Sequence, residues 1–426
     1  MAYTAEIIGV GTELLLGNTI NTDARDISEG LSELGINVYF HTVVGDNPER
    51  LRGAVSIAKS RADIIITTGG LGPTYDDLTK QVLAECFGKK LIRDEETVAS
   101  IREYFDRYRT HTDKEMPENN LQQAMLPEGC TVLRNDRGTA PGCAFESEGT
   151  HVIMLPGPPN ECRSMFKNCV VPYLKDLSDS EIVSHTIHIF GRGESSVELQ
   201  LRDMMEGMTN PTLAPYAKSG EVMLRLTAKA ATRSEAEALM TPVLEAVKRE
   251  LGDVIYAIDG LSLEDTVLKL LAGANRTLAT AESCTGGMMS KRLTDIPGAS
   301  KSYLGGATVY SNHAKRVFLA VDEGLIDEFG AVSEPVARAM AEGVAEKLGA
   351  DIGIGITGIA GPGADGSGKR IGTVFLAMRT PERVYCRELY LGNDRFRNRL
   401  MAVNYAFDTV RRYLTGEPIE ESGEDI

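Results

Sequence analysis

Glu-Ser-Cys-Thr-Gly-Gly (282–287) is the segment of the sequence best suited to covalent chemistry. The surrounding stretch TLATAESCTGGMMSKRL predicts a strand that turns into a helix here, with the hydroxyl of Ser283 presented on the turn. The free N–H groups of a helix start suit a phosphate or a developing oxyanion. Spacing alone supports a helix-capping role for Ser283 equally well. Cys284 has no histidine nearby in sequence to activate it, which favours a packing role.

A lysine follows the next predicted strand, in VYSNHAKRVFL (309–319). Tyr310 ends that strand, and Lys315 falls in the turn or the first helical turn that follows. A lysine that is desolvated in a pocket loses its proton and serves as the base for a serine. An average lysine is a solvated surface charge, so spacing leaves both interpretations of Lys315 open.

Two more C-terminal segments are suited to binding phosphate. GITGIAGPGADGSGK predicts a strand and then a glycine-rich loop, in which Thr357 and Gly358 are placed to meet a phosphate or an amide. This loop is not a P-loop, because Arg370 stands where Ser or Thr must follow the lysine. Arg395 and Arg399 are four residues apart, so on a helix they share a face that suits a phosphate clamp. The alternatives are a flexible connection and a solvated charged face.

Glycines and carboxylates are combined in TTGGLGPTYDDLTK (67–80), where the backbone is free to meet a phosphate and paired aspartates suit a divalent metal ion. Carboxylates around a diphosphate repel it unless a cation intervenes, so the pattern indicates metal-assisted chemistry on a phosphoanhydride. The alternative is that Asp77 and Thr79 only cap a helix. The predicted substrate-binding residues are Gly69, Gly70, Gly72 and Thr74, and the predicted metal ligands are Asp76 and Asp77 with Glu13 and Asp46 from two other strand ends.

An α/β architecture must position these segments. Apolar strand patterns such as DIIIT (63–67) alternate with helical ones early in the chain, which predicts a parallel, helix-covered sheet with ligands at the carboxyl ends of its strands. The alternation of strand and helix patterns stops after about residue 170 and returns from about residue 262. We therefore predict an α/β fold with two three-layer parallel-sheet domains joined by a small α+β module. The predicted divisions are residues 1–170, 171–258 and 259–415, followed by an acidic, disordered tail at 416–426.

Composition limits the class of protein. The 426 residues include 45 Lys and Arg against 61 Asp and Glu, a net charge of −16, which argues against general binding to nucleic acids or anionic membranes. The 7 cysteines contain no CxxC motif, so neither a zinc site nor a disulfide framework is indicated. The N-terminus lacks a signal-peptide pattern, and no apolar stretch approaches the ~18 residues of a membrane span. We expect a cytoplasmic protein.

The chain resembles the competence/damage-inducible CinA family over essentially its full length. The resemblance rests on GTELLLGN, GGLGPTYDD, LPGPPNE, FGRGES, PTLAPYAKSGEVMLRLTAKA, AESCTGG, VYSNHAK, GAVSEPV and GITGIAGP, in this order. It implies an N-terminal domain with the molybdopterin-binding fold of MoaB and MogA, associated in this family with metal-dependent ADP-ribose pyrophosphatase activity. It also implies a C-terminal domain like the stand-alone PncC amidases, which convert nicotinamide mononucleotide to nicotinate mononucleotide and ammonia. Both activities belong to pyridine-nucleotide salvage.

The resemblance also implies residue roles. Ser283 looks like the amidase nucleophile, with Tyr310 and Lys315 as its activating partners. Substrate, oxyanion or phosphate contacts are implied for Thr285, Gly286, Gly287, Thr357, Gly358, Arg395 and Arg399. No cofactor is implied for the amidase, and a divalent metal ion is implied for the N-terminal domain. The family often has Gly-Asp-Glu where this chain has Gly11-Thr12-Glu13, and an Asn where it has Asp23.

Two alternatives to a two-activity salvage enzyme are open. One is a pterin- or nucleotide-binding module with a single active domain, and the other is a recruitment protein for DNA uptake or repair, as the family name suggests. The absence of a basic stripe weighs against direct DNA contact. The expected partners are nicotinamide mononucleotide and ADP-ribose, without nucleic acid or membrane. Domains of both implied types often self-associate, so we expect a homodimer.

Overall fold

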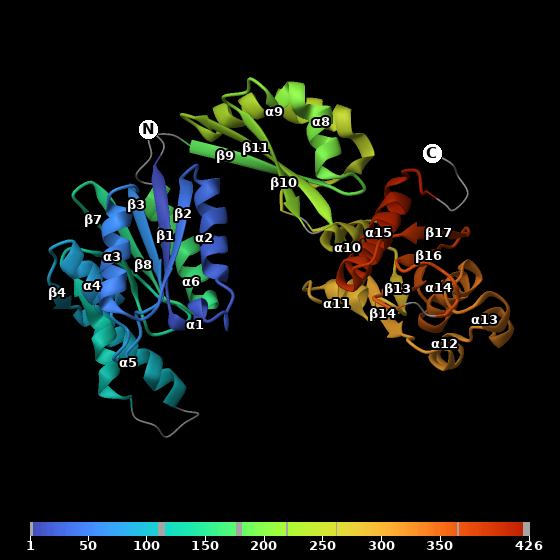
Figure 1. Cartoon of the computed structure of the whole chain (residues 1–426), viewed down its shortest axis with the longest axis horizontal. Coiled ribbons are helices and arrows are strands. Elements are labelled where there is room, and N and C mark those ends of the chain that lie inside the picture. The colour runs from blue at the N-terminus through green and yellow to red at the C-terminus, as the bar shows by residue number, and fades with distance from the viewer. Residues whose placement is uncertain are drawn as a thin grey trace. The chain divides into compact units, whose positions relative to one another are not determined.

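The structure is a computed structural model that describes residues 3–109, 116–175, 181–218, 220–260, 262–363 and 366–420. These residues fall into two compact units (Figure 1). Unit 1 comprises Met1–Val183 and Ala228–Ala238, and unit 2 comprises Ser184–Thr227 and Leu239–Ile426. Within the described ranges, no helix combines the length and apolar character that a membrane span requires.

Unit 1 is built on a six-stranded sheet with the strand order β2-β1-β3-β8-β7-β6. Strand β3 is buried along its whole length, as its apolar, β-branched sequence requires when both faces are covered. The first four strands of that order run parallel, whereas β7 and β6 are antiparallel. The strand bounds are β1 Thr4–Val10, β2 Asn37–Val44, β3 Ile64–Thr68, β6 Thr131–Leu133, β7 Gly142–Ser147 and β8 Thr150–Leu155, with β4 Leu91–Arg93 and β5 Met125–Pro127 forming a separate pair.

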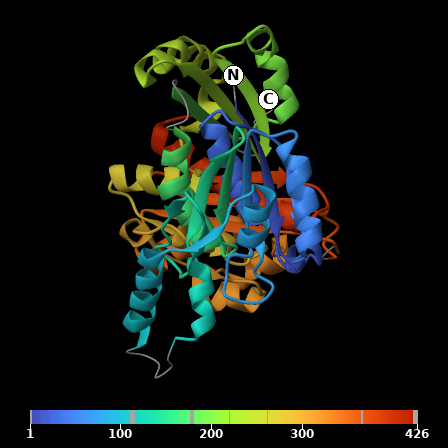
Figure 2. The ribbon, with the colours of Figure 1, turned by 90° about the vertical axis from the view of Figure 1, so that its left-hand side faces the viewer.

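Helices cover both faces of this sheet. Alternate residues of a strand point to opposite faces, so Ile8 shares a core with α3 and α4, while Ile7 shares another with α2 and α6 (Figure 1). Helix α5 projects past the end of the sheet (Figures 1 and 2). The helix bounds are α1 Thr12–Leu15, α2 Thr22–Glu33, α3 Pro48–Lys59, α4 Thr79–Cys86, α5 Glu95–Arg109, η1 Glu118–Ala124, α6 Pro159–Met165, η2 Phe166–Val170 and α7 Val171–Lys175.

A four-stranded sheet with the order β10-β11-β9-β12 follows, together with two helices. The ring of Phe190, directly after β9, lies edge-on to Tyr405 of the C-terminal helix α15, with ring centroids 5.0 Å apart. Phe190 is buried in the same cluster as Phe407, so this module and the C-terminal part share a core within unit 2. The bounds are β9 Glu181–Ile189, α8 Glu194–Met205, β10 Thr212–Lys218, β11 Glu221–Ala230, α9 Arg233–Leu251, η3 Gly252–Val254 and β12 Ile255–Ile258.

The C-terminal part contains a five-stranded sheet with the order β14-β13-β15-β16-β17. Helices α10, α11 and α15 contribute to the core on one face, and α12, α13 and α14 contribute to the core on the other. The bounds are α10 Leu263–Gly273, β13 Leu278–Glu282, α11 Met288–Thr294, η4 Ala299–Lys301, β14 Tyr303–Thr308, α12 Asn312–Leu319, α13 Glu323–Phe329, α14 Glu334–Leu348, β15 Ile352–Gly358, β16 Thr373–Arg379, β17 Val384–Tyr390 and α15 Arg395–Thr415.

The α/β class predicted from the sequence is confirmed, but neither large sheet is wholly parallel. Strand β16 pairs antiparallel with β15, and β17 pairs antiparallel with β16, just as β7 pairs with β8 and β6 with β7 in unit 1. Of the predicted tail, residues 417–420 contact unit 2, through an ion pair from Glu420 to Arg387 and a bond from Arg412 to the carbonyl of Pro418. Residues 421–426 lie outside the described residues.

Candidate functional site

The predicted nucleophile and base meet in the C-terminal part of unit 2. Ser283 follows β13 directly, and its N–H donates to the carbonyl of Ile356 at 2.9 Å. Lys315 lies in α12, a helix that Ser311 caps by accepting from the N–H of Ala314 at 3.1 Å. The Nζ atom of Lys315 lies 3.1 Å from the Oγ atom of Ser283. The lysine is 2% exposed and the serine 8%, so the contact is almost free of solvent.

Burial changes the proton affinity of this pair. Desolvation lowers the pKa of Lys315, because the ammonium form loses its hydration. The neighbouring thiol of Cys284 has its pKa raised to about 12 by burial, so at neutral pH it stays protonated and supplies no charge to hold the lysine proton. The Nζ atom also lies 3.1 Å from the carbonyl of Val309, which orients the amine. A neutral Lys315 is therefore placed to accept the hydroxyl proton of Ser283.

The turn that follows Ser283 can stabilise an oxyanion. Gly286 and Gly287 have φ of +61° and +87°, left-handed values that favour glycine. The N–H of Gly286 donates to the carbonyl of Ser283 at 3.1 Å, so it is not free for a ligand. Within the described residues the N–H groups of Thr285 and Gly287 have no acceptor. These two donors, rather than all three predicted residues, are available.

A buried carboxylate that the sequence analysis did not single out supports this turn. Glu282 is fully buried and accepts from the N–H groups of Met289 and Ser290, at 3.1 and 2.8 Å, and from the Ser290 hydroxyl at 2.8 Å. It thereby ties the end of β13 to the start of α11 on either side of Ser283. A glutamate immediately before a strand-end serine was the available signal for this role.

The other predicted C-terminal residues divide into two groups. Arg399 donates from Nη2 to the carbonyl of Thr285 at 2.6 Å, beside the nucleophile turn. Tyr310 is 65% exposed and accepts from Nη2 of Arg395 at 3.4 Å, while Nη1 of Arg395 donates to the carbonyl of Gly361 at 2.8 Å. In the described part of the chain, the Tyr310 hydroxyl is thus bonded to an arginine and makes no hydrogen bond to the nucleophile or the base.

Thr357 and Gly358 lie at the end of β15. Their surroundings differ from the prediction that both meet a phosphate or an amide. The hydroxyl of Thr357 is buried and donates to the carbonyl of Ala331 at 2.8 Å, so it fixes a loop instead of remaining free. A Cβ atom at Gly358 would come within 2.7 Å of the Thr373 carbonyl, so glycine is needed there for strand packing. The Thr285 hydroxyl, in contrast, is buried without a partner in the described residues.

In unit 1 the structure gathers the predicted glycines and carboxylates around one cavity of about 540 Å³. Its floor is the end of the parallel strands, where ligands of such sheets bind. The sequence analysis missed Gln123 and Glu161, which also line it. The predicted residues that line the cavity are Glu13, Asp46, Gly69, Gly70, Gly72, Thr74, Asp76 and Asp77.

Three carboxylates of this cavity bond to threonines of the loops around it. Asp46 accepts from the N–H and the hydroxyl of Thr12, at 2.9 and 2.8 Å. Asp77 accepts from the N–H of Thr74 at 2.8 Å, and the Thr74 hydroxyl bonds to both Asp76 and Asp77. Over the described ranges, no three His, Cys, Asp or Glu side chains converge as a metal cage. The oxygen donors suit a hard cation such as Mg²⁺, which commonly takes one or two carboxylates and completes its shell with ligand phosphates.

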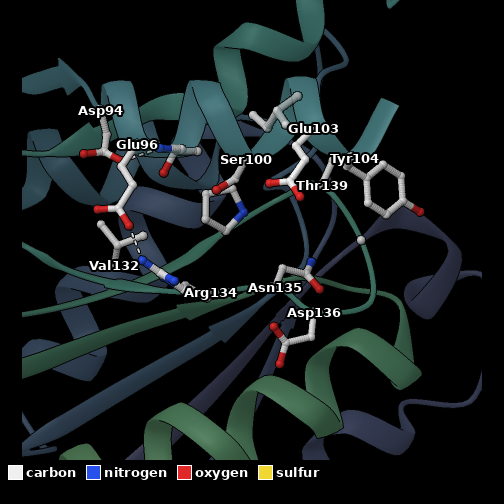
Figure 3. Close-up of a pocket in the computed structure, with 14 residues that line it drawn as sticks. Asp94, Glu96, Ser100, Glu103, Tyr104, Val132, Arg134, Asn135, Asp136 and Thr139 are labelled. Atoms are coloured by element: carbon white, nitrogen blue, oxygen red, sulfur yellow. Dashed lines mark hydrogen bonds and ion pairs between the residues drawn. The ribbon is translucent and has the colours of Figure 1, made fainter. Parts of the chain in front are cut away.

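A second cavity of about 450 Å³, which the sequence analysis did not predict, lies against α5 (Figure 3). Glu96 is paired with Arg134 across it, and Asp94 caps the helix by accepting from the N–H of Thr97 at 2.8 Å. Thr139 lines this cavity and the first one, so the two are neighbours. Asp94 and Glu96 are thus capping and paired, which gives these two acids a structural explanation.

Three family descriptions match successive parts of the chain. Residues 6–176 match the "Probable molybdopterin binding domain", residues 184–257 the "Damage-inducible protein CinA KH domain" and residues 261–414 the "CinA C-terminal domain".

Curated relatives give the same family. The chain is 47% identical to a CinA-like protein of Dictyoglomus turgidum, with 96% of this chain and 98% of that protein covered. It is 45% identical to a CinA-like protein of Kosmotoga olearia over the same shares. A solved CinA of unknown function from Thermoplasma acidophilum is 34% identical, covering 42% of this chain and 99% of that one, with a TM-score of 0.37. The chain belongs to the CinA family.

Proposed function

We propose that the C-terminal part hydrolyses the carboxamide of nicotinamide mononucleotide, giving nicotinate mononucleotide and ammonia. The observation that carries the proposal is the 3.1 Å contact between Lys315 Nζ and Ser283 Oγ in a nearly solvent-free site. A buried lysine beside a strand-end serine is the arrangement expected of a serine nucleophile with a lysine base. A purely capping Ser283 would not need a buried amine.

Neutral Lys315 removes the hydroxyl proton while Ser283 Oγ attacks the carboxamide carbon. The tetrahedral oxyanion is stabilised by the N–H groups of Thr285 and Gly287, which cost no reorganisation because the turn is already formed. The protonated lysine then returns its proton to the leaving nitrogen, and ammonia departs from an acyl-enzyme. Water then attacks the ester while Lys315 accepts one of its protons. Lys315 returns this proton to Ser283 Oγ as nicotinate mononucleotide leaves, which restores the serine.

Arginines on α15 supply the charge for the substrate phosphate in this proposal. Arg395 and Arg399 are one helical turn apart, and the exposed Tyr310 ring lies beside Arg395. A guanidinium matches phosphate in a bidentate manner, which suits a mononucleotide better than a nucleoside.

Ammonia release by the purified chain tests this function. We expect release from nicotinamide mononucleotide, and about 100-fold lower kcat/KM with nicotinamide riboside, because two arginine–phosphate interactions are lost. Equal rates for the two substrates would remove the phosphate part of the proposal. No ammonia from either substrate would remove the amidase itself.

We also propose that the cavity of unit 1 hydrolyses the diphosphate of ADP-ribose to AMP and ribose 5-phosphate. The supporting observation is that the glycine loop and five carboxylates line a single cavity. One or two of the predicted ligands Glu13, Asp46, Asp76 and Asp77 would hold a divalent cation, which would neutralise charge on the diphosphate when bound. The backbone of Gly69–Gly72 would contact the phosphates.

Calorimetry separates ligand binding from turnover at this second site. We expect ADP-ribose to bind in the presence of Mg²⁺ and at least about tenfold more weakly without it, because carboxylates and phosphates repel each other. The formation of AMP then tests the reaction itself. Binding without AMP would reduce unit 1 to a nucleotide-binding module.

The third hypothesis, recruitment to DNA, has less support. The module at residues 184–257 is similar to a KH domain, a fold that clamps nucleic acid with a G-x-x-G loop. No G-x-x-G occurs in that stretch of the sequence, and the net charge of −16 opposes a polyanion. We therefore propose no direct nucleic-acid contact, which a gel-shift assay with single-stranded DNA would test. Homodimerisation and cytoplasmic location stay predictions.

A further inference from the structure

A third cavity in unit 1, of about 560 Å³, lies between α2 and the segment formed by α6 and η2. It is separate from the glycine-rich cavity, and no residue lines both. Asp23, in the first turn of α2, lines it. Asp23 stands where the family often has an asparagine. It is not one of the predicted metal ligands.

The carboxyl group of Asp23 is buried, and little in the structure offsets the loss of its hydration. Its side chain belongs to a residue only 7% exposed, and its Oδ1 atom has no hydrogen-bond partner among the described residues. The nearest cation, Arg163, is already bonded to Asp26, from Nε at 2.7 Å and from Nη2 at 2.6 Å. Arg25 bonds to Asp26 as well. Among the described residues, Asp23 therefore lacks the guanidinium partners that Asp26 has.

Burial and the negative charge of Asp26 raise the pKa of Asp23 to about 6, and Arg163 offsets only part of this effect. The carboxyl is thus ionised at neutral pH in a place that disfavours the charge. A group of this kind is stabilised by a donor that enters the cavity, and most strongly by a cation.

The rest of the cavity wall is largely apolar. Ile27, Cys162 and Phe166 are each at most 6% exposed and form the wall beside Asp23. Burial raises the pKa of the Cys162 thiol well above its usual range, so the thiol is neutral and adds no charge. A Cβ atom at Gly30 would come within 2.3 Å of the Phe166 ring, so glycine is what allows α2 and η2 to enclose this space.

We propose that this cavity binds a small organic ammonium ion whose apolar body packs on Ile27 and Phe166 while its N–H groups donate to Asp23. The volume lies within the range of small-molecule pockets, roughly 300–1,000 Å³. The charged groups at the rim are Glu29 and Glu33 from α2 and Lys167 from η2, in addition to the Asp26–Arg163 pair. With four acids and two bases around it, the cavity favours cations over anions.

Benzylamine and benzyl alcohol are suitable probes, because they share a body and differ in charge. We expect the full chain at about pH 8 to bind benzylamine at least about tenfold more tightly than the alcohol, as measured by ligand-detected NMR. Asp23→Asn keeps the shape and removes the charge, and it should lose that tenfold preference. Glu49→Gln, an exposed acid of α3 outside the cavity, should keep it.

A pH titration provides the second readout. The amine stays protonated over this range, so its affinity should fall about tenfold as the pH drops from about 8 to about 5 and Asp23 takes up its proton. Equal binding of the two probes, equal binding by the Asp23→Asn chain or no binding of benzylamine at millimolar concentration would each overturn the proposal. In those cases the cavity holds only water.

Discussion

The two candidate catalytic sites of this chain differ in how complete they are. In unit 2 the proposed nucleophile, its proposed base and two free N–H donors are fixed by the fold before any ligand arrives. In unit 1 the glycine loop forms a cavity, but Asp76 and Asp77 bond to Thr74 of their own loop, and Asp46 bonds to Thr12. Proton transfer within the protein needs internal groups at fixed distances, whereas a phosphate site can be completed by the ligand and its cation.

Removal of the proposed nucleophile should give the largest effect on activity. It tests whether the unit 2 site acts as a preformed serine–lysine pair. We expect Ser283→Ala to lower kcat for ammonia release by about 10⁴-fold or more, since a member of a catalytic unit is lost. The matched control is Cys284→Ala, which removes the neighbouring buried thiol and should change kcat less than about threefold. If the cysteine variant loses activity and the serine variant keeps it, the nucleophile has been misassigned.

Loss of the base should cost about 10³-fold in kcat, as for a typical general base. Lys315→Met tests this, and Lys315→Arg separates charge from basicity because arginine does not deprotonate. In the wild-type chain the depressed pKa of Lys315 should make kcat/KM rise with pH to a midpoint below the ordinary lysine value of 10.5, since only the neutral amine is a base. An active arginine variant with an unchanged pH profile would contradict the assignment.

Stability of unit 1 should depend on Asp23. Its pKa is 3.8 in an exposed setting and about 6 in the fold, so the folded state binds the proton more tightly than the unfolded state. The contribution of Asp23 to stability is therefore most favourable below pH 3.8 and is lost as the pH rises to about 6, a change of up to about 3 kcal/mol. Asp23→Asn should raise the melting temperature at about pH 8 and change it little at about pH 3.5, as calorimetry would show. A destabilised variant at pH 8 would mean that the carboxylate has a partner.

Chelation should distinguish the two sites within one preparation. We expect EDTA to lower AMP formation from ADP-ribose by about 100-fold and to leave ammonia release unchanged, because carboxylates line the unit 1 cavity whereas the proposed amidase uses a serine and a lysine. Excess Mg²⁺ should restore the first activity. If ammonia release also falls, a metal contributes to the amidase, and the contrast between the sites disappears.

The phosphate contact should give the smallest of these effects. Arg395→Ala should raise KM for nicotinamide mononucleotide about tenfold with kcat nearly unchanged, which is the signature of uniform binding. The control is Arg397→Ala, an exposed arginine on the same helix. Tyr310→Phe sharpens the result, because a fall in kcat would support the activating role implied by the family resemblance, whereas a rise in KM would place Tyr310 with Arg395.

Local patterns predicted much of the fold, because they report which faces are covered. DIIIT gave a buried strand, and the strand-turn-helix around Ser283 was found where spacing placed it. The direction of β16 could not be predicted, since GTVFLAMR is apolar whether the strand runs parallel or antiparallel to β15. Strand direction depends on connections, and these leave little trace in the periodicity.

The sequence predicted which residues form the candidate site better than it predicted their hydrogen-bond partners. The meeting of Ser283 with Lys315 agrees with the expectation from the family resemblance. The bonds that occupy Thr357, Asp46 and Asp77 depend on side-chain directions, which sequence spacing does not determine. Asp23 was noticed only as a departure from the family pattern, because its burial follows from helix packing that a sequence does not show.

The shared core around Phe190 limits where the chain can be divided into separately expressed fragments. Phe190 comes from the module after unit 1, yet its ring is buried against Tyr405 and in one cluster with Phe407 of α15. A truncated protein that starts near residue 261 would expose this aromatic face to water and so favour aggregation. Polar residues in place of those aromatics would be needed to make the C-terminal part soluble as a separate fragment. A fragment that begins at residue 184 would need no such redesign.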